Sequence, residues 1–183
     1  GQIINIAIDS TETVSIKAEY PGMASQYEVS GSEECSRIKE LTLMQMGLQT
    51  QLNAIANNPQ LGADAVNDSV ARVVEAYKTR VKTDYIFKEP MKASSYFALF
   101  QTLNAGGQSV LIFNPRSSEQ DVKVFAAVAT SWDTFYPNEE RGENLHNIAI
   151  EGMKDIRIIK NKQAQGLVAA DKVNTTGIID FTL

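Results

Sequence analysis

Two long stretches of helical periodicity, joined by a short turn, constrain the fold of this chain more than any other sequence feature. In the first, Ser32 occupies an N-cap position and an apolar stripe continues to about Ala56. The stripe comprises Ile38, Leu41, Leu48, Leu52 and Ile55. The second stretch runs from about Asp64 to Lys88, with acidic residues early and basic residues late, as the helix dipole favours. Each helix would be roughly 36 Å long at about 1.5 Å per residue, so the pair predicts an antiparallel helical hairpin.

Three more helices are predicted after this hairpin. Residues 90–103 begin with a proline, which suits a first helical turn, and they are so apolar that we expect this short helix to be buried. A fourth helix is expected to start after an N-cap at Ser117 or Ser118 and to end near Phe135. A fifth helix is expected over about residues 138–162, with glutamates in its first turns and basic residues in its last.

Extended structure is predicted at both ends of the chain. Apolar and polar residues alternate along residues 3–20 on either side of a polar turn, which predicts a β-hairpin, and residues 26–30 form a weaker third strand. Residues 110–113 predict a brief extended run. Residues 177–183 predict a strand that needs a partner, either the N-terminal hairpin or protein beyond residue 183. The fold class expected is therefore α+β: an array of about five helices with an N-terminal β-hairpin and a C-terminal strand.

The length of 183 residues suits one domain or slightly more. We expect three parts: a β-hairpin segment over residues 1–31, a helical domain over 32–165, and a linker with one strand over 166–183. With 43% apolar and 21% charged residues, a packed core is feasible without a metal or disulfide. Gly1 stands where an initiator methionine is normally found, so we expect the chain to be a piece of a longer protein.

Charge and motifs argue against several classes of function. A net charge of −5 and a pI near 5.0 are unlike a nucleic-acid-binding surface, which needs clustered basic residues. The longest apolar run, residues 124–129, is far shorter than a membrane span. Gly-x-Ser-x-Gly, Gly-x-Gly-x-x-Gly and P-loop motifs are absent from the sequence. We therefore assign no catalytic, cofactor-binding or metal-binding residues and expect no cofactor.

Three groups of side chains are candidates for carrying chemistry. Cys35 lies in a helical first turn, where the dipole lowers a thiol pKa, but it has no partner cysteine and we expect a structural role. Glu143 and His146 have the Glu-x-x-His spacing of di-iron bundles, yet such a site needs a second motif, and His146 is the only histidine of the chain. The aromatic set could line a ligand pocket between helices, although its helical spacing favours simple core. This set is Tyr96, Phe97, Phe100, Phe125, Trp132, Phe135 and Tyr136.

Three segments, in this order, resemble the TlpA/ResA-like thioredoxin-family proteins of the bacteroidete cell envelope. Residues 27–32, Tyr-Glu-Val-Ser-Gly-Ser, resemble the junction between a small β domain and a helical insert, and residues 85–100 resemble the insert itself. Residues 177–183, Gly-Ile-Ile-Asp-Phe-Thr-Leu, are similar to the strand that opens the thioredoxin module. The chain lacks the Cys-x-x-Cys of that module, so no catalytic residue is carried over.

The resemblance implies a non-catalytic accessory or interaction domain of an envelope thiol:disulfide oxidoreductase, which positions or recognises substrate proteins or self-associates. Its implied partner is a downstream thioredoxin-like domain, and its implied location is the periplasm or cell envelope, where the full-length precursor could carry a lipid anchor. Two other functions remain open. One is a helical binding module for a small apolar ligand, and the other is an enzyme that uses Cys35 or the acidic face near Glu139 and Glu143.

Overall fold

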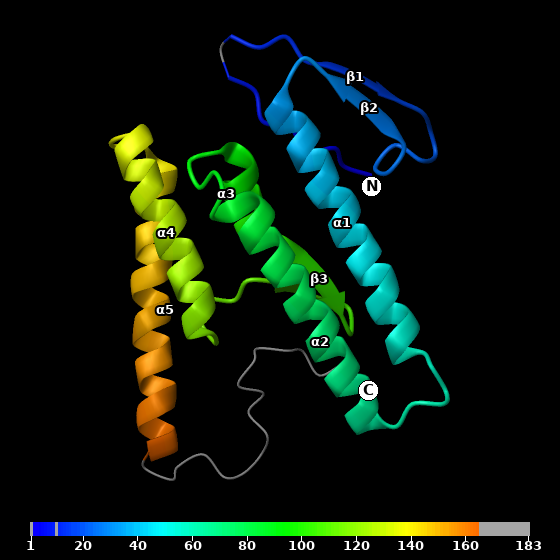
Figure 1. Ribbon diagram of the computed structural model, residues 1–183, viewed down its shortest axis with the longest axis vertical. Helices are drawn as coiled ribbons and strands as arrows, with labels where there is room; N and C mark the ends of the chain where they lie inside the picture. Colours follow the sequence, from blue (N-terminus) through cyan, green and yellow to red (C-terminus); the bar gives the residue numbers. More distant parts are fainter. Residues whose placement is uncertain (1, 10, 165–183) are drawn as a thin grey trace.

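Two antiparallel helix pairs with a short helix between them form the body of the protein. The computed structural model describes residues 2–9 and 11–164. Helices α1 (Glu33–Ala56) and α2 (Ala63–Val81) form one pair, and α4 (Glu119–Phe135) and α5 (Glu140–Ala164) form the other. The short helix α3 (Ala93–Leu99) lies between the pairs and packs on both α1 and α4 (Figure 1).

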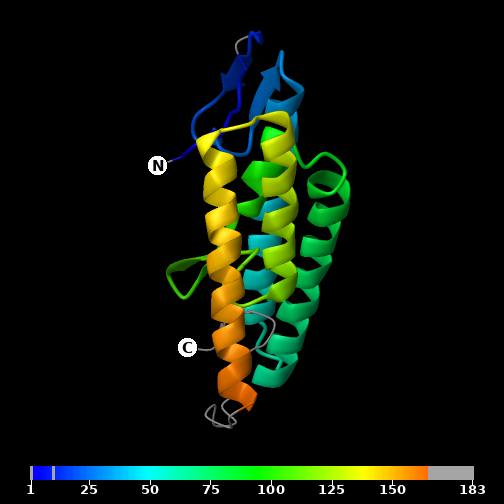
Figure 2. The same cartoon turned by 90° about the vertical axis from the view of Figure 1, so that its left-hand side faces the viewer.

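The helix boundaries confirm most of the sequence predictions. The Ser32 hydroxyl accepts a hydrogen bond from the Cys35 backbone N–H and caps α1, and the Ser118 hydroxyl does the same for the Asp121 N–H in α4. The second predicted helix is also present, since α2 continues into the π-helical turn η1 (Lys82–Ile86). The longest described helix, α5, packs lengthwise beside α4 (Figure 2).

The predicted helix over residues 90–103 is wrong at both ends. Helix α3 has only seven residues, because its end is followed by strand β3 (Thr102–Ala105), which pairs with β4 (Gln108–Leu111). Gly106 and Gly107 both have positive φ, +55° and +82°, and form the two-residue turn of this hairpin. The extended run predicted at 110–113 coincides with the second arm only at residues 110 and 111, and the hairpin itself was not predicted.

The N-terminal hairpin is also paired differently from the prediction. Strand β1 (Ser15–Ala18) pairs with β2 (Tyr27–Ser30) in an antiparallel register that places Ser15 opposite Ser30. The predicted pairing of residues 3–8 with 13–20 is wrong. Residues 2–9 are instead held by groups outside β1, because the Cys35 thiol donates to the Ala7 carbonyl and the Gln2 side chain bonds to the loop before β2.

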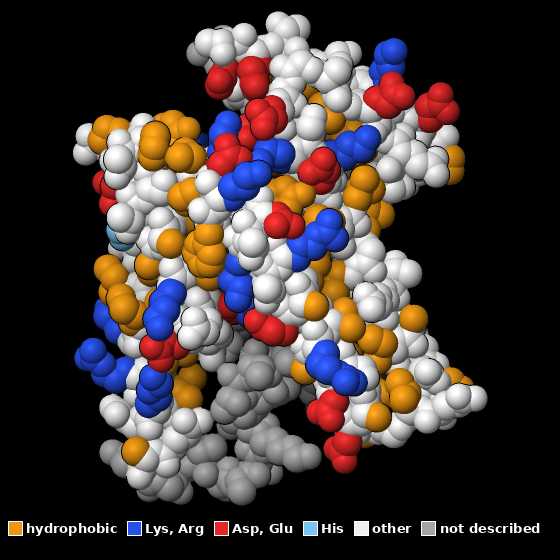
Figure 3. Space-filling model, in the orientation of Figure 1, with side chains coloured by type: hydrophobic (Ala, Val, Ile, Leu, Met, Phe, Trp, Pro, Cys, Tyr) orange, Lys and Arg blue, Asp and Glu red, His pale blue; other side chains and the backbone are white. Residues whose placement is uncertain are grey.

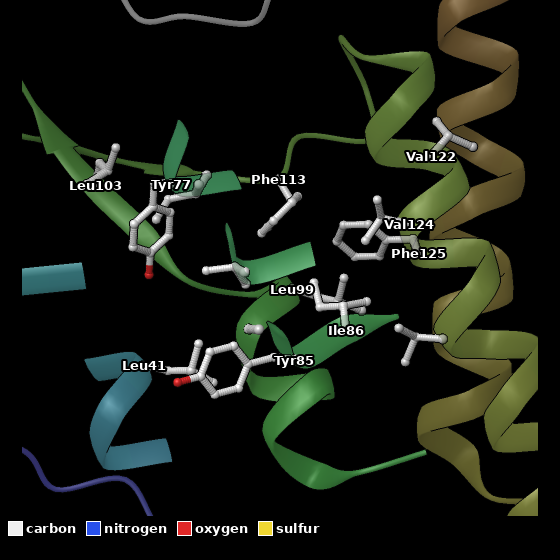
Figure 4. Close-up of a cluster of buried hydrophobic side chains, with 14 of the residues drawn as sticks. Leu41, Tyr77, Tyr85, Ile86, Leu99, Leu103, Phe113, Val122, Val124 and Phe125 are labelled. Carbon is white, nitrogen blue, oxygen red and sulfur yellow. The ribbon is translucent and has the colours of Figure 1, made fainter. Parts of the chain in front are cut away.

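A continuous hydrophobic core joins the two helix pairs. Figure 4 shows Ile86 and Leu99 near the middle of the cluster, with Phe125 entering from α4 and Leu41 from α1. The predicted stripe of α1 is confirmed, since Ile38, Leu41, Leu48 and Leu52 are buried. The α4 residues predicted to face inward are buried as well: Val122, Phe125, Val128, Ala129 and Trp132.

A buried ion pair crosses this core. Lys78 of α2 and Asp121 of α4 lie 2.7 Å apart, and both side chains are almost fully buried. The same Asp121 oxygen accepts a hydrogen bond from the Asn114 backbone N–H at 2.8 Å, and the Lys78 ammonium lies over the Phe113 ring. Burial raises the pKa of Asp121, an effect that the Lys78 charge opposes. The pair fixes the start of α4 against α2.

The fold is α+β and mostly helical, as the sequence predicted. Within residues 2–9 and 11–164, the strands form two separate two-stranded sheets. The strand predicted at 177–183 and the linker expected from residue 166 onward lie outside the described residues. None of the described helices is long and apolar enough to cross a membrane.

Candidate functional site

An aromatic groove opens between α3, the α4–α5 pair and the N-terminal segment, residues 2–9. It has a volume of about 640 Å³, within the range typical of ligand sites. We call it the aromatic groove and define it by the residues that line it: Asn5, Ile6, Ala7, Ile8, Ile38, Ala93, Tyr96, Phe97, Phe100, Trp132, Arg141 and Asn144.

Helix α3 supplies the main wall because its two faces are used differently. Residues 93, 96, 97 and 100 recur at three- and four-residue steps, so they share the side that borders the groove. Ala98 and Leu99 lie on the other side and are fully buried in the core. The rings of Tyr96, Phe97 and Phe100 are therefore only partly buried, while the opposite side of α3 is packed in the core.

Charged groups from α1 fix the start of α3. The Glu34 carboxylate accepts a hydrogen bond from the Ser94 backbone N–H at 2.7 Å, which satisfies a donor of the first helical turn. Arg37 donates to the Ser94 hydroxyl at 3.0 Å and pairs with Glu89 at 2.7 Å. The fully buried Ser95 hydroxyl lies within hydrogen-bond distance of two backbone carbonyls, 3.1 Å from that of Tyr85 and 2.8 Å from that of Glu89, and its single proton can be donated to either. These contacts hold the aromatic wall in a fixed position.

The rings of the wall contact one another as a continuous series. The Tyr96 ring centroid lies 5.0 Å from that of Phe100 and 5.1 Å from that of Trp132. Behind them, Phe100 meets the buried Phe125 edge to face at 5.7 Å. The Trp132 indole N–H donates to the Pro90 carbonyl, so the indole keeps its polar atom paired while its face borders the groove.

One end of the groove is polar. Arg141 and Asn144, from the first two turns of α5, lie beside Tyr96. Burial raises the pKa of the Tyr96 phenol, and the nearby Arg141 charge and the Asn144 side chain oppose that rise. Tyr96 is therefore protonated at neutral pH and can donate a hydrogen bond. The Arg141 guanidinium is paired with Glu139 at 3.0 Å, so a ligand would meet a partly neutralised cation.

The N-terminal segment forms the opposite wall. Its Ile6 and Ile8 side chains are 46% and 52% exposed, although they border an apolar groove. The segment joins no sheet within residues 2–9 and 11–164. One contact that holds it is the hydrogen bond from the Cys35 thiol to the Ala7 carbonyl, at 3.1 Å. Exposed isoleucines beside aromatic rings make this end of the groove a surface that apolar groups can cover.

The structure divides the aromatic set named from sequence. Tyr96, Phe97, Phe100 and Trp132 line the groove, and Phe125 lies behind it in the core. Phe135 and Tyr136 are exposed and do not line it, although Tyr136 contacts the Trp132 ring. The sequence reading missed Ile38, the polar pair Arg141 and Asn144, and residues 5–8. Only the three-residue spacing of Arg141 and Asn144 could have signalled that they share a helix face.

The other candidate residues are not brought together. Cys35 is buried and directed at the Ala7 carbonyl, whereas His146 faces Asp133 of α4 at 2.6 Å. Glu143 is exposed on α5, and no cluster of three or more metal-ligating side chains occurs in the part of the chain that the structure describes. The aromatic groove is therefore the feature of this chain best suited to binding.

Comparisons with protein-family models, with curated proteins and with solved structures find no match for this chain. Function is therefore inferred from the groove and from the segments of sequence described above. The groove offers ring faces, aliphatic side chains and a few hydrogen-bonding groups. Such a surface binds apolar groups and orients them by one polar end.

Proposed function

We propose that this chain is a non-catalytic recognition domain of an envelope thiol:disulfide oxidoreductase, and that its aromatic groove holds an apolar segment of a substrate protein. The observation that carries this proposal is a row of partly buried rings, Tyr96, Phe97 and Phe100, at the anchored helix α3, which the buried Trp132 of α4 extends along the groove. The resemblance of three sequence segments to TlpA/ResA-like proteins supports the thioredoxin-like context. In this proposal a downstream thioredoxin-like domain performs the redox chemistry in the periplasm or envelope.

The groove suits a polypeptide for two reasons. Its volume of about 640 Å³ accommodates several apolar side chains, and it opens to solvent along the N-terminal segment rather than being sealed. Aromatic side chains bind varied apolar groups at low cost in conformational entropy, because they have few rotatable bonds. A domain that presents many substrates to one redox site needs this tolerance.

A small apolar ligand is the second candidate. The groove volume lies within the range of small-molecule sites, and Tyr96, Asn144 and Arg141 could orient one polar end of such a ligand. Solvent extraction of the purified protein, followed by mass spectrometry, tests this alternative. A stoichiometric apolar compound would favour the small-ligand function over peptide recognition.

The proposed function can be tested with the protein's own fluorophore. Trp132 is the only tryptophan of the chain and borders the groove, so an occupant should change its emission. We expect a short peptide rich in phenylalanine and leucine to shift that emission, and Phe97→Ala to weaken binding about tenfold or more, as loss of an aromatic anchor does.

Phe135→Ala is the matched control, because Phe135 is 54% exposed on α4 and lies outside the groove. It should leave the peptide affinity unchanged. Equal weakening by the two variants, or no change in Trp132 emission, would contradict peptide recognition by the groove. Insulin-disulfide reduction by this chain alone would contradict the non-catalytic role.

A further inference from the structure

A second groove, separate from the aromatic groove, lies between the start of α4 and the last turns of α5. Its volume is about 370 Å³. Val122, Met153 and Ile156 form its apolar floor. Met153 is 53% exposed, although Gly152 of the same helix is buried and Ile156 packs against the core. We call this surface the basic groove because of the charges at its rim.

The rim carries more positive than negative charge. Lys123 and Lys160 lie on either side of Glu119, at 3.5 Å and 2.6 Å, and share that single carboxylate. Lys160 is the larger cause of the lowered pKa of Glu119. Arg157 also lines the groove and forms no ion pair within residues 2–9 and 11–164. Three cations and one anion therefore line the groove, in a chain whose net charge is −5.

The excess of positive charge continues along the last turns of α5. Lys154 and Lys162 are exposed and, like Arg157, have no acidic partner among the described residues. Figure 3 shows basic side chains gathered over the lower half of α4 and α5, with apolar side chains between them. Because like charges repel, such a cluster favours a negatively charged partner.

We propose that the basic groove docks an acidic polypeptide segment, whose apolar side chains contact the floor and whose carboxylates pair with the rim. Two features favour a polypeptide over an anionic bilayer. The apolar side chains form the floor of a groove, where a partner's side chain can insert, whereas a bilayer requires apolar side chains that protrude. A groove between two antiparallel helices also matches the apolar face of a third helix.

The probe for this proposal is a short, fluorescein-labelled amphipathic peptide in which leucine forms one face and glutamate the other. We expect its anisotropy to rise on addition of the protein. Raising the salt from about 0.05 M to about 0.5 M should weaken binding about tenfold or more, because the Debye length falls from over ~10 Å to under ~5 Å.

Two variants measure separately how much the rim charge and the apolar floor contribute to peptide affinity. Arg157→Glu should weaken peptide binding about tenfold or more, and Met153→Ser about fivefold, because one reverses a rim charge and the other removes apolar contact. Lys88→Glu is the matched control, since Lys88 is an exposed cation outside the groove, and the affinity should stay within about twofold. Circular dichroism checks that each variant remains folded.

Several results would overturn the docking proposal. One is an equal affinity for a peptide with lysine in place of glutamate. Another is an equal loss of affinity in Lys88→Glu and Arg157→Glu. A third is binding of phosphatidylglycerol vesicles without binding of the peptide, which would assign the surface to a membrane. A dimer in sedimentation that Arg157→Glu dissociates would assign it to a second copy of this chain.

Discussion

The contribution of the Lys78–Asp121 ion pair to stability depends on the groups around it. Both side chains of the pair are buried, and the second Asp121 carboxylate oxygen, Oδ1, has no hydrogen-bond partner among the described residues. Taking two charges out of water costs several kcal/mol, and their mutual attraction roughly repays that cost only when the geometry is good. The 2.7 Å contact and the Asn114 N–H provide such geometry on the other oxygen, Oδ2.

Removing the Lys78 side chain should therefore destabilise the protein strongly. We expect Lys78→Met to lower the free energy of unfolding by about 3–5 kcal/mol at pH 7, because it leaves a buried carboxylate without its cation. The loss should be smaller near pH 4. Burial already raises the pKa of Asp121, and without Lys78 the folded protein would take up a proton there more readily than the unfolded chain. Urea denaturation at the two pH values measures both effects.

A second substitution distinguishes lost charge balance from lost packing. Asp121→Asn in the Lys78→Met background keeps an acceptor for the Asn114 N–H but removes the unpaired charge. The double variant should be more stable than Lys78→Met alone by about 2 kcal/mol. If the two losses simply add, the destabilisation comes from packing and the electrostatic explanation fails.

At the scale of elements, sequence periodicity predicted what depends on local signals. The boundaries of α1 and the start of α4 follow from N-cap serines and apolar stripes, and the structure confirms them. The shortened α3 and the pairing of β1 with β2 depend on other causes. Gly106 and Gly107 permit a tight hairpin, and Cys35, distant in sequence, helps to hold residues 2–9 away from β1. The Gly-Gly pair is a local hairpin signal that lies outside the apolar periodicity, whereas a tertiary contact such as that of Cys35 leaves no periodic signal.

Only part of the candidate site could be predicted from the sequence, again because local patterns carry no information on tertiary packing. Tyr96, Phe97 and Phe100 could be grouped because they lie in or directly after one short helix. Arg141 could not be placed beside them from sequence, since its position depends on how the α4–α5 pair meets α3. The burial of Lys78 could not be predicted either, because its place near the end of α2 indicated only a favourable interaction with the helix dipole.

Two helical glycines give opposite predictions for the same substitution. A Cβ on Gly152 of α5 would lie 2.5 Å from the Pro115 carbonyl oxygen and 3.0 Å from a Val122 methyl, whereas one on Gly47 of α1 would meet nothing within 4 Å. Alanine favours helix by about 1 kcal/mol at either site. At Gly152 a backbone clash costing about 1–3 kcal/mol outweighs that gain.

We therefore expect Gly47→Ala to raise the free energy of unfolding by about 0.5–1 kcal/mol and Gly152→Ala to lower it by about 1–2 kcal/mol. Denaturant melts of the two variants provide the measurement, and each serves as the control for the other. A stabilised Gly152→Ala protein would show that α5 does not approach the Pro115 loop as closely as the structure places it.

At the scale of the whole molecule, buried polar groups join α1 to the rest of the protein. The Tyr85 phenol of η1 donates to Glu40 of α1 at 2.9 Å, and the Tyr77 phenol of α2 donates to Gln101 at 2.7 Å. The Gln101 amide in turn donates to the Leu41 carbonyl of α1 at 2.9 Å. Because each phenol must keep its proton to donate, these links are sensitive to alkaline pH.

The sign of that sensitivity follows from the direction of the pKa shifts. Burial, reinforced by the Glu40 carboxylate, raises the pKa of Tyr85 to about 12, and burial also raises that of Tyr77. The unfolded chain releases both phenolic protons near pH 10, before the folded protein does. Their contribution to stability is thus complete below about pH 10 and is lost as the pH rises toward 12.

Tyr85→Phe should reduce the decline in the free energy of unfolding between about pH 10 and about pH 12, since each phenol contributes a slope of up to about 1.4 kcal/mol per pH unit. At pH 8 the variant should be less stable than the wild type, because the hydrogen bond to Glu40 is lost. Tyr20→Phe, at a phenol that is 92% exposed, is the control and should keep the wild-type slope. Urea denaturation at a series of alkaline pH values makes the comparison. A Tyr85→Phe protein that kept the full slope would mean that the Tyr85 phenol does not link the unfolding of α1 to alkaline pH.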